Sequence, residues 1–566
     1  MTMAHVLRSF NKRLFTDGAQ AGTVAGVLAG AMRRVLVAGA SGGLVLLYIW
    51  AGQFWTLYGG LAFRLLLVEL PWLVLFIAVT MPPIGRSGPR WVLAAVAGAI
   101  VPVCAYLAHD VFTLHLRRSP EIDDLATIRL LADFGGWPIV AASLFGMLAV
   151  AGVVATVLAW HRVCARRFSR TIAVVAGQVF GVALLFAVYP AWNALLYFEI
   201  GHSTIDAAHH YGRLSSMVHR ASRIPRNDQS MDAQLSRVAQ VPDRFVPATA
   251  QLLLRTIHVV VLEGLADPRR LPGVRFQADP LPAELVQVLG TADLPHGRTP
   301  VFGGSTAQAE FELLTGAPAL SRFGQFEFNA LRGNPAPGLF AALRQCGFVV
   351  QTLVANEPYY FNSIPAYASL GLAPVVFLGR DSQLHDRKVK AVHDEDLLSA
   401  VMTRVRAQRA QDPQARIATY TLGYEGHFPY RRDRQRHPDV VAMTSTDGTA
   451  VDASTRDLVN LLHHRMKAVA AFISAALAED PQAAIVLVGD HLPSAYRALN
   501  EQELHHSILL FIHNGALERL DDVPFHAVTE RLWRVATGQP AATVDHNDWY
   551  LRIMAAGMGR LPAPER

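Results

Sequence analysis

The chain has 566 residues, of which 52% are hydrophobic and only 17% are charged, and its formal net charge is +6 at pH 7. At roughly 150 residues per domain, this length predicts about four domain-sized units. Disordered proteins combine low hydrophobicity with high charge, so this composition excludes an intrinsically disordered chain. The apolar excess lies within residues 1–200, which argues against a purely soluble protein.

Five apolar runs in the N-terminal part are long enough to cross the hydrocarbon core of a bilayer, which takes about 20 helical residues. They cover residues 35–57, 61–81, 91–109, 137–160 and 171–192. Tryptophans lie near several of their ends, as in an interfacial belt. The sequence therefore predicts a cytoplasmic N-terminus at 1–34 and a bundle of five transmembrane helices at 35–193.

Basic side chains occur in alternate loops. They precede the first run and follow the second and fourth runs, at Arg33, Arg34, Arg86, Arg90, Arg162, Arg166, Arg167 and Arg170. The positive-inside rule places these loops in the cytoplasm. Five crossings of the cytoplasmic (inner) membrane then place the rest of the chain on the periplasmic or extracellular face. A nucleic-acid partner is not expected there, despite the net positive charge.

Residues 194–254 form a polar connector that is rich in Arg and His and includes Arg213. We expect a basic interfacial helix that touches phospholipid headgroups. Two ionisable residues, Arg64 and Glu69, lie within the second apolar run. We expect Arg64 to reach the outer interface and Glu69 to pair with it or with another helix.

From residue 255 onward, short apolar runs alternate with amphipathic helices. The runs are 257–262, 348–354, 416–421, 484–488 and 507–512. This alternation predicts an α/β domain with a largely parallel sheet over 255–566. Ligands bind such sheets at the carboxyl ends of the strands, so the residues that follow each run are candidates for a site.

Polar side chains occupy several of these positions. Thr306, after Ser305 and two glycines, lies at the start of a predicted helix, where its hydroxyl can meet a phosphoryl oxygen. Ser and Thr are also frequent helix caps, so this position alone does not establish a nucleophile. The candidates are Glu263, Thr306, His427, Asp490 and His491.

The Asp490–His491 pair directly follows a run of purely apolar residues. A buried carboxylate without a partner is costly, so a cation is the expected partner. With Glu263 and Thr306, this pair offers three oxygen ligands and one nitrogen ligand. Such a set suits a divalent metal, for which we favour Mn²⁺, with Zn²⁺ as the alternative.

The chain from about 255 to 540 resembles the sulfatase-like branch of the alkaline phosphatase superfamily. Within that branch it is most similar to the lipoteichoic acid synthase group of phosphoglycerol transferases, which have five N-terminal spans and an outward-facing catalytic domain. The likeness is carried, in the family's order, by Glu263, by the G-x-T-x-x-x-E-F motif at 304–311, by His427-Phe428-Pro429-Tyr430 and by Gly489-Asp490-His491.

The resemblance implies roles for these residues. Thr306 would attack a phosphodiester to form a phosphothreonine, and His427 would contact the phosphoryl group or assist proton transfer. Glu263, Thr306, Asp490 and His491 would hold the metal. The implied reaction moves a phosphoglycerol-type headgroup from a phospholipid donor to an extracytoplasmic glycan acceptor. The donor would be phosphatidylglycerol, or phosphatidylethanolamine if the headgroup is phosphoethanolamine.

One motif departs from the family. Ser363 follows Tyr360-Phe361-Asn362 where the family has an Arg, which removes a bidentate phosphate contact. Arg380 and Lys388 are candidate substitutes, although solvated surface positions are the expectation for both. The alternatives are a phosphoethanolamine transferase of the same superfamily, a phosphodiesterase or phosphatase that uses water as the acceptor, and a non-enzymatic membrane scaffold.

Overall fold

The computed structural model describes residues 24–52, 63–80, 211–246 and 252–561 except 324, 325 and 359, together with parts of 95–110 and 180–192. The chain divides into two compact units, one of residues 1–132 and 137–223 and one of 133–136 and 224–566. The predicted membrane run at 137–160 lies outside the described residues, and the runs at 91–109 and 171–192 lie only partly within them.

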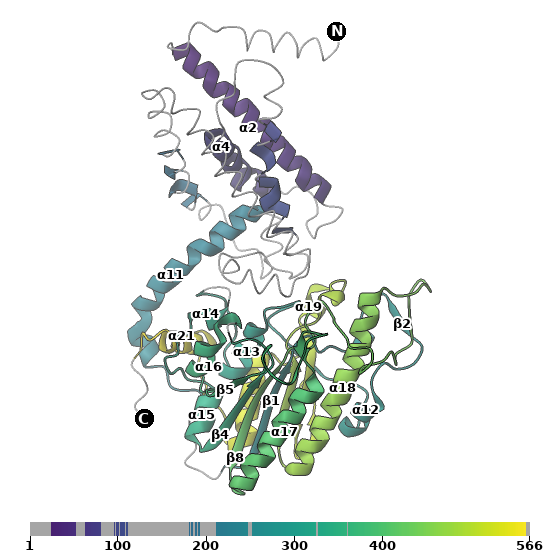
Figure 1. The fold of residues 1–566 in the computed structure, drawn as a ribbon. Helices are drawn as coiled ribbons and strands as arrows, with labels where there is room; N and C mark the ends of the chain where they lie inside the picture. Colours follow the sequence, from purple (N-terminus) through teal and green to yellow (C-terminus); the bar gives the residue numbers. More distant parts are fainter. Residues whose placement is uncertain are drawn as a thin grey trace. The chain divides into compact units, whose positions relative to one another are not determined.

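The first unit contains α2 (Val24–Gly52), α3 (Phe63–Val68) and α4 (Leu70–Thr80), which lie at the purple end of the colour scale in Figure 1. The helix α2 begins at Val24, before the apolar run predicted at 35–57. Arg33 and Arg34 do not interrupt it, because Arg is a good helix former. None of the described helices combines the length and the apolar content that a bilayer crossing requires.

The helix α11 (Arg213–Ala239) occupies the predicted connector. Arg213 does not face headgroups, as we had expected, but is buried, and its guanidinium donates hydrogen bonds of 2.5 and 2.9 Å to Asp110. A buried guanidinium needs an ionic partner, so Arg213 pairs with Asp110 instead of contacting headgroups. Glu69 does find a partner on another helix, since its Oε2 accepts a hydrogen bond of 2.9 Å from the Ser215 backbone N–H.

The second unit is built on an eight-stranded sheet in the order β12-β11-β10-β1-β8-β4-β5, with β3 paired to β11. The parallel strands are β1 (Thr256–Leu262), β4 (Phe348–Val354), β5 (Val375–Phe377), β8 (Arg416–Gly423) and β10 (Ala484–Gly489). The antiparallel edge consists of β11 (His506–His513), β12 (Ala516–Glu518) and β3 (His296–Arg298). The predicted α/β domain is confirmed, with this antiparallel edge added.

Helices cover both faces of the sheet. In β1, Ile257, Val259 and Val261 join one apolar core, whereas Val260 and Leu262 join another. The first core includes residues of α13 (Thr306–Thr315), α15 (Leu339–Gln345), α20 (Phe525–Thr537) and α21 (His546–Gly557). The second includes residues of α12 (Ala283–Leu289), α17 (Asp394–Gln411) and α18 (Ala453–Glu479). Strands buried on both faces need apolar residues at every position, which explains the continuous runs.

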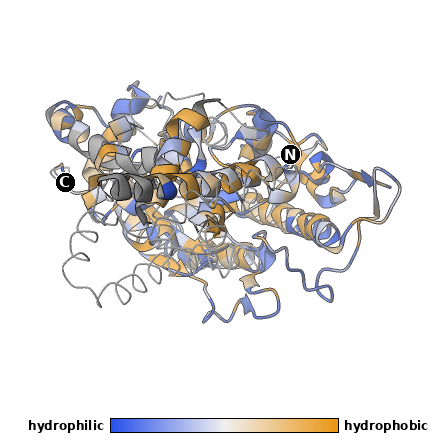
Figure 2. Cartoon of the chain, turned by 90° about the horizontal axis from the view of Figure 1, so that it is seen from above, coloured by the Kyte–Doolittle hydropathy of each residue, from blue (hydrophilic) through white to orange (hydrophobic). Residues whose placement is uncertain are grey.

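Short elements complete this unit. They are α14 (Glu327–Ala330), α16 (Ser363–Ser369), α19 (Glu501–Leu504), β2 (Val274–Phe276), β6 (His385–Asp386), β7 (Ala391–Val392) and β9 (Met443–Ser445). Many of the peripheral loops are hydrophilic, while hydrophobic residues gather on the helices and strands (Figure 2).

Three adjacent parallel strands end together. Leu262 of β1 pairs with Gly489 of β10 on one side and with Gly423 of β8 on the other. The loops that follow these strands therefore leave the sheet side by side. The packing around Gly489 is close: a Cβ atom added there would lie 1.9 Å from the Leu265 carbonyl oxygen and 2.7 Å from Ser507 Oγ.

We expect Gly489→Ala to destabilise the chain by about 3 kcal/mol or more, because backbone atoms would have to move to admit the methyl group. The measurement is the thermal unfolding midpoint of the purified full chain. Gly448→Ala is the matched control, since Gly448 has a φ of +85° but nothing within 4 Å. Its cost is only conformational, about 1 kcal/mol. Equal shifts for the two variants would contradict the close packing at Gly489.

Candidate active site

The structure brings together three of the predicted metal ligands at the carboxyl ends of β1 and β10. Ligand atoms of Glu263, Asp490 and His491 all lie within 4.8 Å of one another. His491 Nε2 is 3.2 Å from Asp490 Oδ2 and 3.9 Å from Glu263 Oε1. All three residues are buried, so the cluster lies at the edge of the sheet where parallel strands bind ligands.

The arrangement of this cluster fits a metal ion. Asp490 Oδ1 accepts hydrogen bonds of 2.8 Å from the backbone N–H groups of Gly264 and His491. Asp490 Oδ2 and His491 Nε2 are buried and have no hydrogen-bond partner among the described residues. His491 Nδ1 lies 3.1 Å from the Leu492 carbonyl oxygen, and a proton on Nδ1 leaves Nε2 with its lone pair. Two unsatisfied buried ligand atoms thus point into the same small space.

Electrostatics at the cluster also favour a cation. Burial raises the pKa of Glu263 well above its ordinary value, and the Asp490 carboxylate raises it further. The positive charge of Arg465 offsets this effect only in part. Arg465 is itself buried, and its Nε donates a hydrogen bond of 2.6 Å to Asp394 Oδ2. A divalent ion would compensate two neighbouring carboxylates that otherwise disfavour each other's charge.

Thr306 is the first residue of α13 and is only 5% exposed. Ser305 precedes it in the left-handed region, with φ of 71°, and its side chain makes no capping hydrogen bond. The Gly303 N–H donates a hydrogen bond of 3.1 Å to the Leu492 carbonyl oxygen. This bond holds the loop before Thr306 against the loop that carries Asp490 and His491.

His427 lies in the loop after β8, and its Nε2 is 3.5 Å from Glu263 Oε1. The ring stacks on Tyr424, with centroids 4.8 Å apart, and Nδ1 hydrogen-bonds to the Phe428 carbonyl oxygen. Burial lowers the pKa of His427 to about 3, and the positive charge of Arg431 acts in the same direction. The ring is therefore uncharged at neutral pH and, with so low a pKa, is a weak base.

Glu310, the acid of the G-x-T-x-x-x-E-F motif, ties the helix of Thr306 to the sheet. Its Oε1 accepts hydrogen bonds from the hydroxyl groups of Tyr367 on α16, at 2.6 Å, and of Tyr420 on β8, at 2.5 Å. All three side chains are buried, and burial raises the pKa of Glu310 to about 7 despite these bonds.

This raised pKa predicts a pH dependence of stability. Between the ordinary Glu value of 4.5 and about 7, the folded chain keeps the Glu310 proton that the unfolded chain loses. Stability contributed by the neutral acid is therefore full below pH 4.5 and is lost as the pH rises towards 7. We expect Glu310→Gln, which stays neutral and can still accept from both tyrosines, to gain thermal stability relative to wild type across this range. A pH-independent difference between the two midpoints would contradict this assignment.

A cavity of about 430 Å³ lies beside His427. Its wall includes Glu425, His427 and Phe428 from the loop after β8. It also includes four basic residues: Arg380, Arg387 and Lys390 from the stretch between β5 and β7, and Arg431 from the loop after β8. Glu357 and Glu425 supply carboxylates to the same wall. A predominantly basic cavity next to the site suits an anionic group.

The residue that replaces the family's Arg does not line this cavity. Ser363 is buried, and its hydroxyl donates to the Tyr360 carbonyl oxygen. Arg380, which we expected only on the solvated surface, is exposed but lines the cavity. Lys388 instead forms an ion pair of 3.0 Å with Asp433. The basic charge near the site therefore comes from positions that the family motif does not include.

Sequence analysis missed Arg465 and a second buried cluster, His393, Glu425 and His437. Arg465 could have been found, because it lies on the apolar face of α18 at helical spacing from Leu458, Leu462 and Val469. The second cluster carries no such signal, since its members come from three segments that only the fold brings together.

No family model matches the chain. A curated relative, a putative cyclic beta-1,2-glucan modification protein from Rhizobium meliloti, is 26% identical over 263 residues, which is 45% of this chain and 38% of that protein. The matched segment thus spans less than half the length of the curated relative.

Two solved structures give low-identity matches. The phosphoglycerol transferase GacH from Streptococcus pyogenes, in complex with sn-glycerol-1-phosphate, is 14% identical, with a TM-score of 0.42 over 59% of this chain and 92% of that chain. The lipoteichoic acid synthase LtaP from Listeria monocytogenes is 15% identical, with a TM-score of 0.35 over 49% and 66%.

Proposed function

We propose that this chain is a metal-dependent transferase of the sulfatase-like type. It moves a phosphoglycerol-type headgroup from a membrane phospholipid to an extracytoplasmic glycan through a phosphothreonine at Thr306. The apolar runs of residues 35–193 would anchor it in the cytoplasmic membrane, with residues 255–566 outside the cytoplasm. The observation that carries this proposal is the buried cluster of Glu263, Asp490 and His491, whose loop after β10 is hydrogen-bonded to the loop that leads into Thr306.

In this proposal Glu263, Asp490, His491 and Thr306 hold a divalent metal. When bound, the metal would lower the pKa of the Thr306 hydroxyl and neutralise charge on the phosphoryl oxygens. The choice between Mn²⁺ and Zn²⁺ belongs to experiment, because a set of oxygen ligands with one imidazole suits both.

The chain's own residues account for the proton balance. Thr306 Oγ forms a bond to phosphorus while the bond from phosphorus to the diacylglycerol oxygen breaks. His427, whose Nε2 lies 3.5 Å from Glu263 Oε1, takes the threonine proton and passes it to the departing oxygen. In the second half, an acceptor hydroxyl gives its proton to His427, attacks phosphorus and releases Thr306, which regains the proton.

The basic cavity beside His427 supports an anionic headgroup as the transferred species. Arg380, Arg387 and Arg431 are able to contact the phosphate, in place of the Arg that Ser363 replaces. Phosphoethanolamine is a second candidate headgroup, because Glu357 also lines the cavity and could pair with an ammonium group. For the acceptor, the name of the curated relative suggests a β-1,2-glucan.

The test uses the purified full chain in liposomes that contain Mn²⁺ and either phosphatidylglycerol or phosphatidylethanolamine, with and without cyclic β-1,2-glucan. Diacylglycerol and modified glucan are quantified by mass spectrometry. We expect diacylglycerol from phosphatidylglycerol, and modified glucan only when both substrates are present.

Other outcomes redirect or refute the proposal. Diacylglycerol from phosphatidylethanolamine alone would make the headgroup phosphoethanolamine. Diacylglycerol with free headgroup phosphate, and no glucan product, would indicate that water is the acceptor. Equal release by the Thr306→Ala variant would exclude the phosphothreonine.

A further inference from the structure

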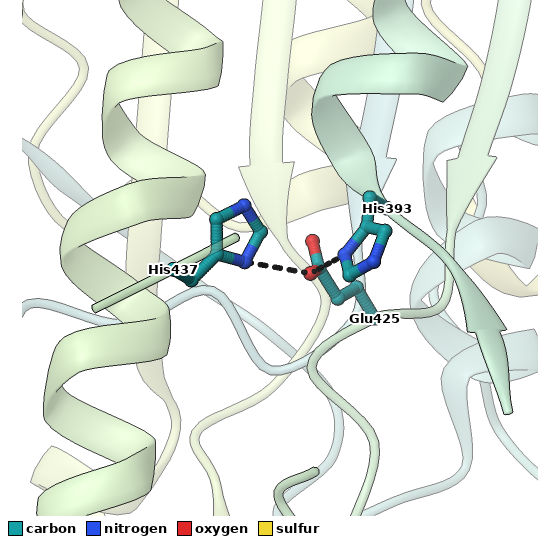
Figure 3. Close-up of side chains that lie close together, drawn as sticks. All are labelled: His393, Glu425 and His437. Atoms are coloured by element: carbon teal, nitrogen blue, oxygen red, sulfur yellow. Dashed lines mark hydrogen bonds and ion pairs between the residues drawn. The ribbon is translucent and has the colours of Figure 1, made fainter. Parts of the chain in front are cut away.

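A second buried cluster lies apart from the proposed nucleophile and is not explained by it. Ligand atoms of His393, Glu425 and His437 all lie within 4.8 Å of one another, and all three residues are buried. Figure 3 shows the two imidazole rings on either side of Glu425, both directed at the same carboxylate oxygen. His393 Nδ1 lies 2.6 Å and His437 Nδ1 lies 3.7 Å from Glu425 Oε1.

One of these ligand atoms is unsatisfied. His437 is 5% exposed, and its Nδ1 has no hydrogen-bond partner among the described residues, since 3.7 Å is too long for one. A buried ring nitrogen aimed at a carboxylate and a second imidazole is costly unless something lies between them. The feature therefore points to a ligand that binds all three groups.

The outer sides of these residues are arranged as in metal sites. Histidines that bind metals usually direct the other ring nitrogen at a carboxylate or a carbonyl group, which orients the ring. Here His393 Nε2 lies 3.1 Å from Asp386 Oδ2, and His437 Nε2 lies 3.5 Å from Glu395 Oε1. The outer oxygen of Glu425, Oε2, accepts a hydrogen bond of 2.9 Å from the Asp394 backbone N–H. Each of the three inner ligand atoms thus has an orienting contact behind it.

We propose that His393, Glu425 and His437 form a second divalent-cation site, with the two Nδ1 atoms and Glu425 Oε1 as ligands. Two imidazoles and one carboxylate form a set that Zn²⁺ prefers, and a water molecule would complete a tetrahedral shell. Ligand atoms in such a shell lie ~3.3 Å apart, given bonds of about 2.0–2.1 Å. The His393–Glu425 contact would open to this distance, and the His437–Glu425 contact would close to it.

A cation would replace the present contact between two of the ligands. His393 Nδ1 lies 2.6 Å from Glu425 Oε1, so these two atoms share a hydrogen bond, while His437 Nδ1 has no partner among the described residues. A divalent ion between the three ligand atoms would satisfy all of them.

The site would tie together three segments around the cavity. His393 directly precedes α17, Glu425 belongs to the loop after β8, and His437 lies in the following loop. Glu425 lines the cavity and is separated from His427 by one residue. The inference does not depend on the proposed transferase reaction, because it rests on separate residues and is tested by metal binding alone.

The test measures the metal content of the purified full chain after incubation with Zn²⁺ and dialysis, by elemental analysis. Two variants separate the two sites: Asp490→Asn, in the first cluster, and His437→Gln, in the second. We expect two ions per chain in wild type, one in each single variant and none in the double variant. The matched control is His464→Gln, because His464 stacks on His437 at 4.8 Å but lies outside the cluster. It should keep both ions.

A spectroscopic measurement of bound Co²⁺ tests the second site separately from any effect of the variants on folding. Co²⁺ added to the Asp490→Asn variant should give visible absorption bands of a nitrogen- and oxygen-ligated ion, and His437→Gln should abolish them. Asp386→Asn, which alters only the carboxylate behind His393, should weaken Zn²⁺ affinity by about 10–100-fold. If Asp490→Asn binds neither Zn²⁺ nor Co²⁺ while its thermal midpoint matches that of wild type, the second site does not exist. Retention of the second ion by a folded His437→Gln variant would equally overturn it.

Discussion

Thr306→Ala is expected to lower turnover by about 10³-fold or more, because the variant lacks the oxygen that forms the covalent intermediate. The fold should survive, since Ala is a good helix former at the first position of α13. The measurements are diacylglycerol release from phospholipid liposomes and the thermal unfolding midpoint. Mass spectrometry of wild type, quenched during turnover, should find a headgroup phosphate on the peptide that contains Thr306 and find none in the variant.

Two controls sharpen this prediction. Thr306→Ser keeps a hydroxyl in place and should retain measurable turnover. Ser305→Ala removes a neighbouring hydroxyl that makes no capping hydrogen bond, so its turnover should stay within about tenfold of wild type. If Ser305→Ala abolished turnover and Thr306→Ala did not, the nucleophile would be Ser305.

Asp490→Asn is expected to remove one bound metal ion per chain and to lower turnover by about 10³-fold, since metal stabilisation of phosphoryl charge contributes several kcal/mol. This substitution distinguishes the roles of the two carboxylate oxygens of Asp490. The amide oxygen can still accept the hydrogen bonds that Gly264 and His491 donate to Oδ1. The amide nitrogen replaces Oδ2, the buried oxygen without a partner, and cannot bind a cation.

The matched control is Asp480→Asn. Asp480 precedes β10 at the amino end of the same strand, where it accepts a hydrogen bond of 2.6 Å from Thr256 Oγ1. It lies at the opposite edge of the sheet from the cluster, so metal content and turnover should not change. Asp490→Asn protein with a full complement of metal would remove Asp490 from the proposed ligand set.

The local sequence was sufficient to predict the candidate site residues that directly follow a strand. Runs of apolar residues can be recognised without a fold, because strands buried on both faces tolerate few polar side chains. Glu263 and Asp490 were therefore visible as carboxylates directly after such runs, and parallel pairing of their strands brings them together. The antiparallel direction of β11 was not visible, since strand direction depends on how the chain returns to the sheet.

The basic cavity and the His393 cluster show the limits of such inference. Arg380 and Arg431 line one cavity although 50 residues separate them, and both look like ordinary surface cations in the sequence. His437 becomes a candidate ligand only because a loop places its Nδ1 opposite Glu425 but beyond hydrogen-bond distance of every residue that the structure describes. Burial and lost hydrogen bonds are properties of the packed state and leave no mark on local sequence patterns.

The sequence by itself determined the α/β class of residues 255–566 and the positions of Glu263, Asp490 and His491 directly after apolar strands, because periodicity and strand ends are local properties of the chain; Thr306 was predicted only through the family resemblance. The tertiary structure alone decided that Arg213 pairs with Asp110, that Ser363 is buried away from the cavity, and that His393, Glu425 and His437 converge. These features depend on contacts between distant segments, whose free energies arise only when packing removes water from charged groups.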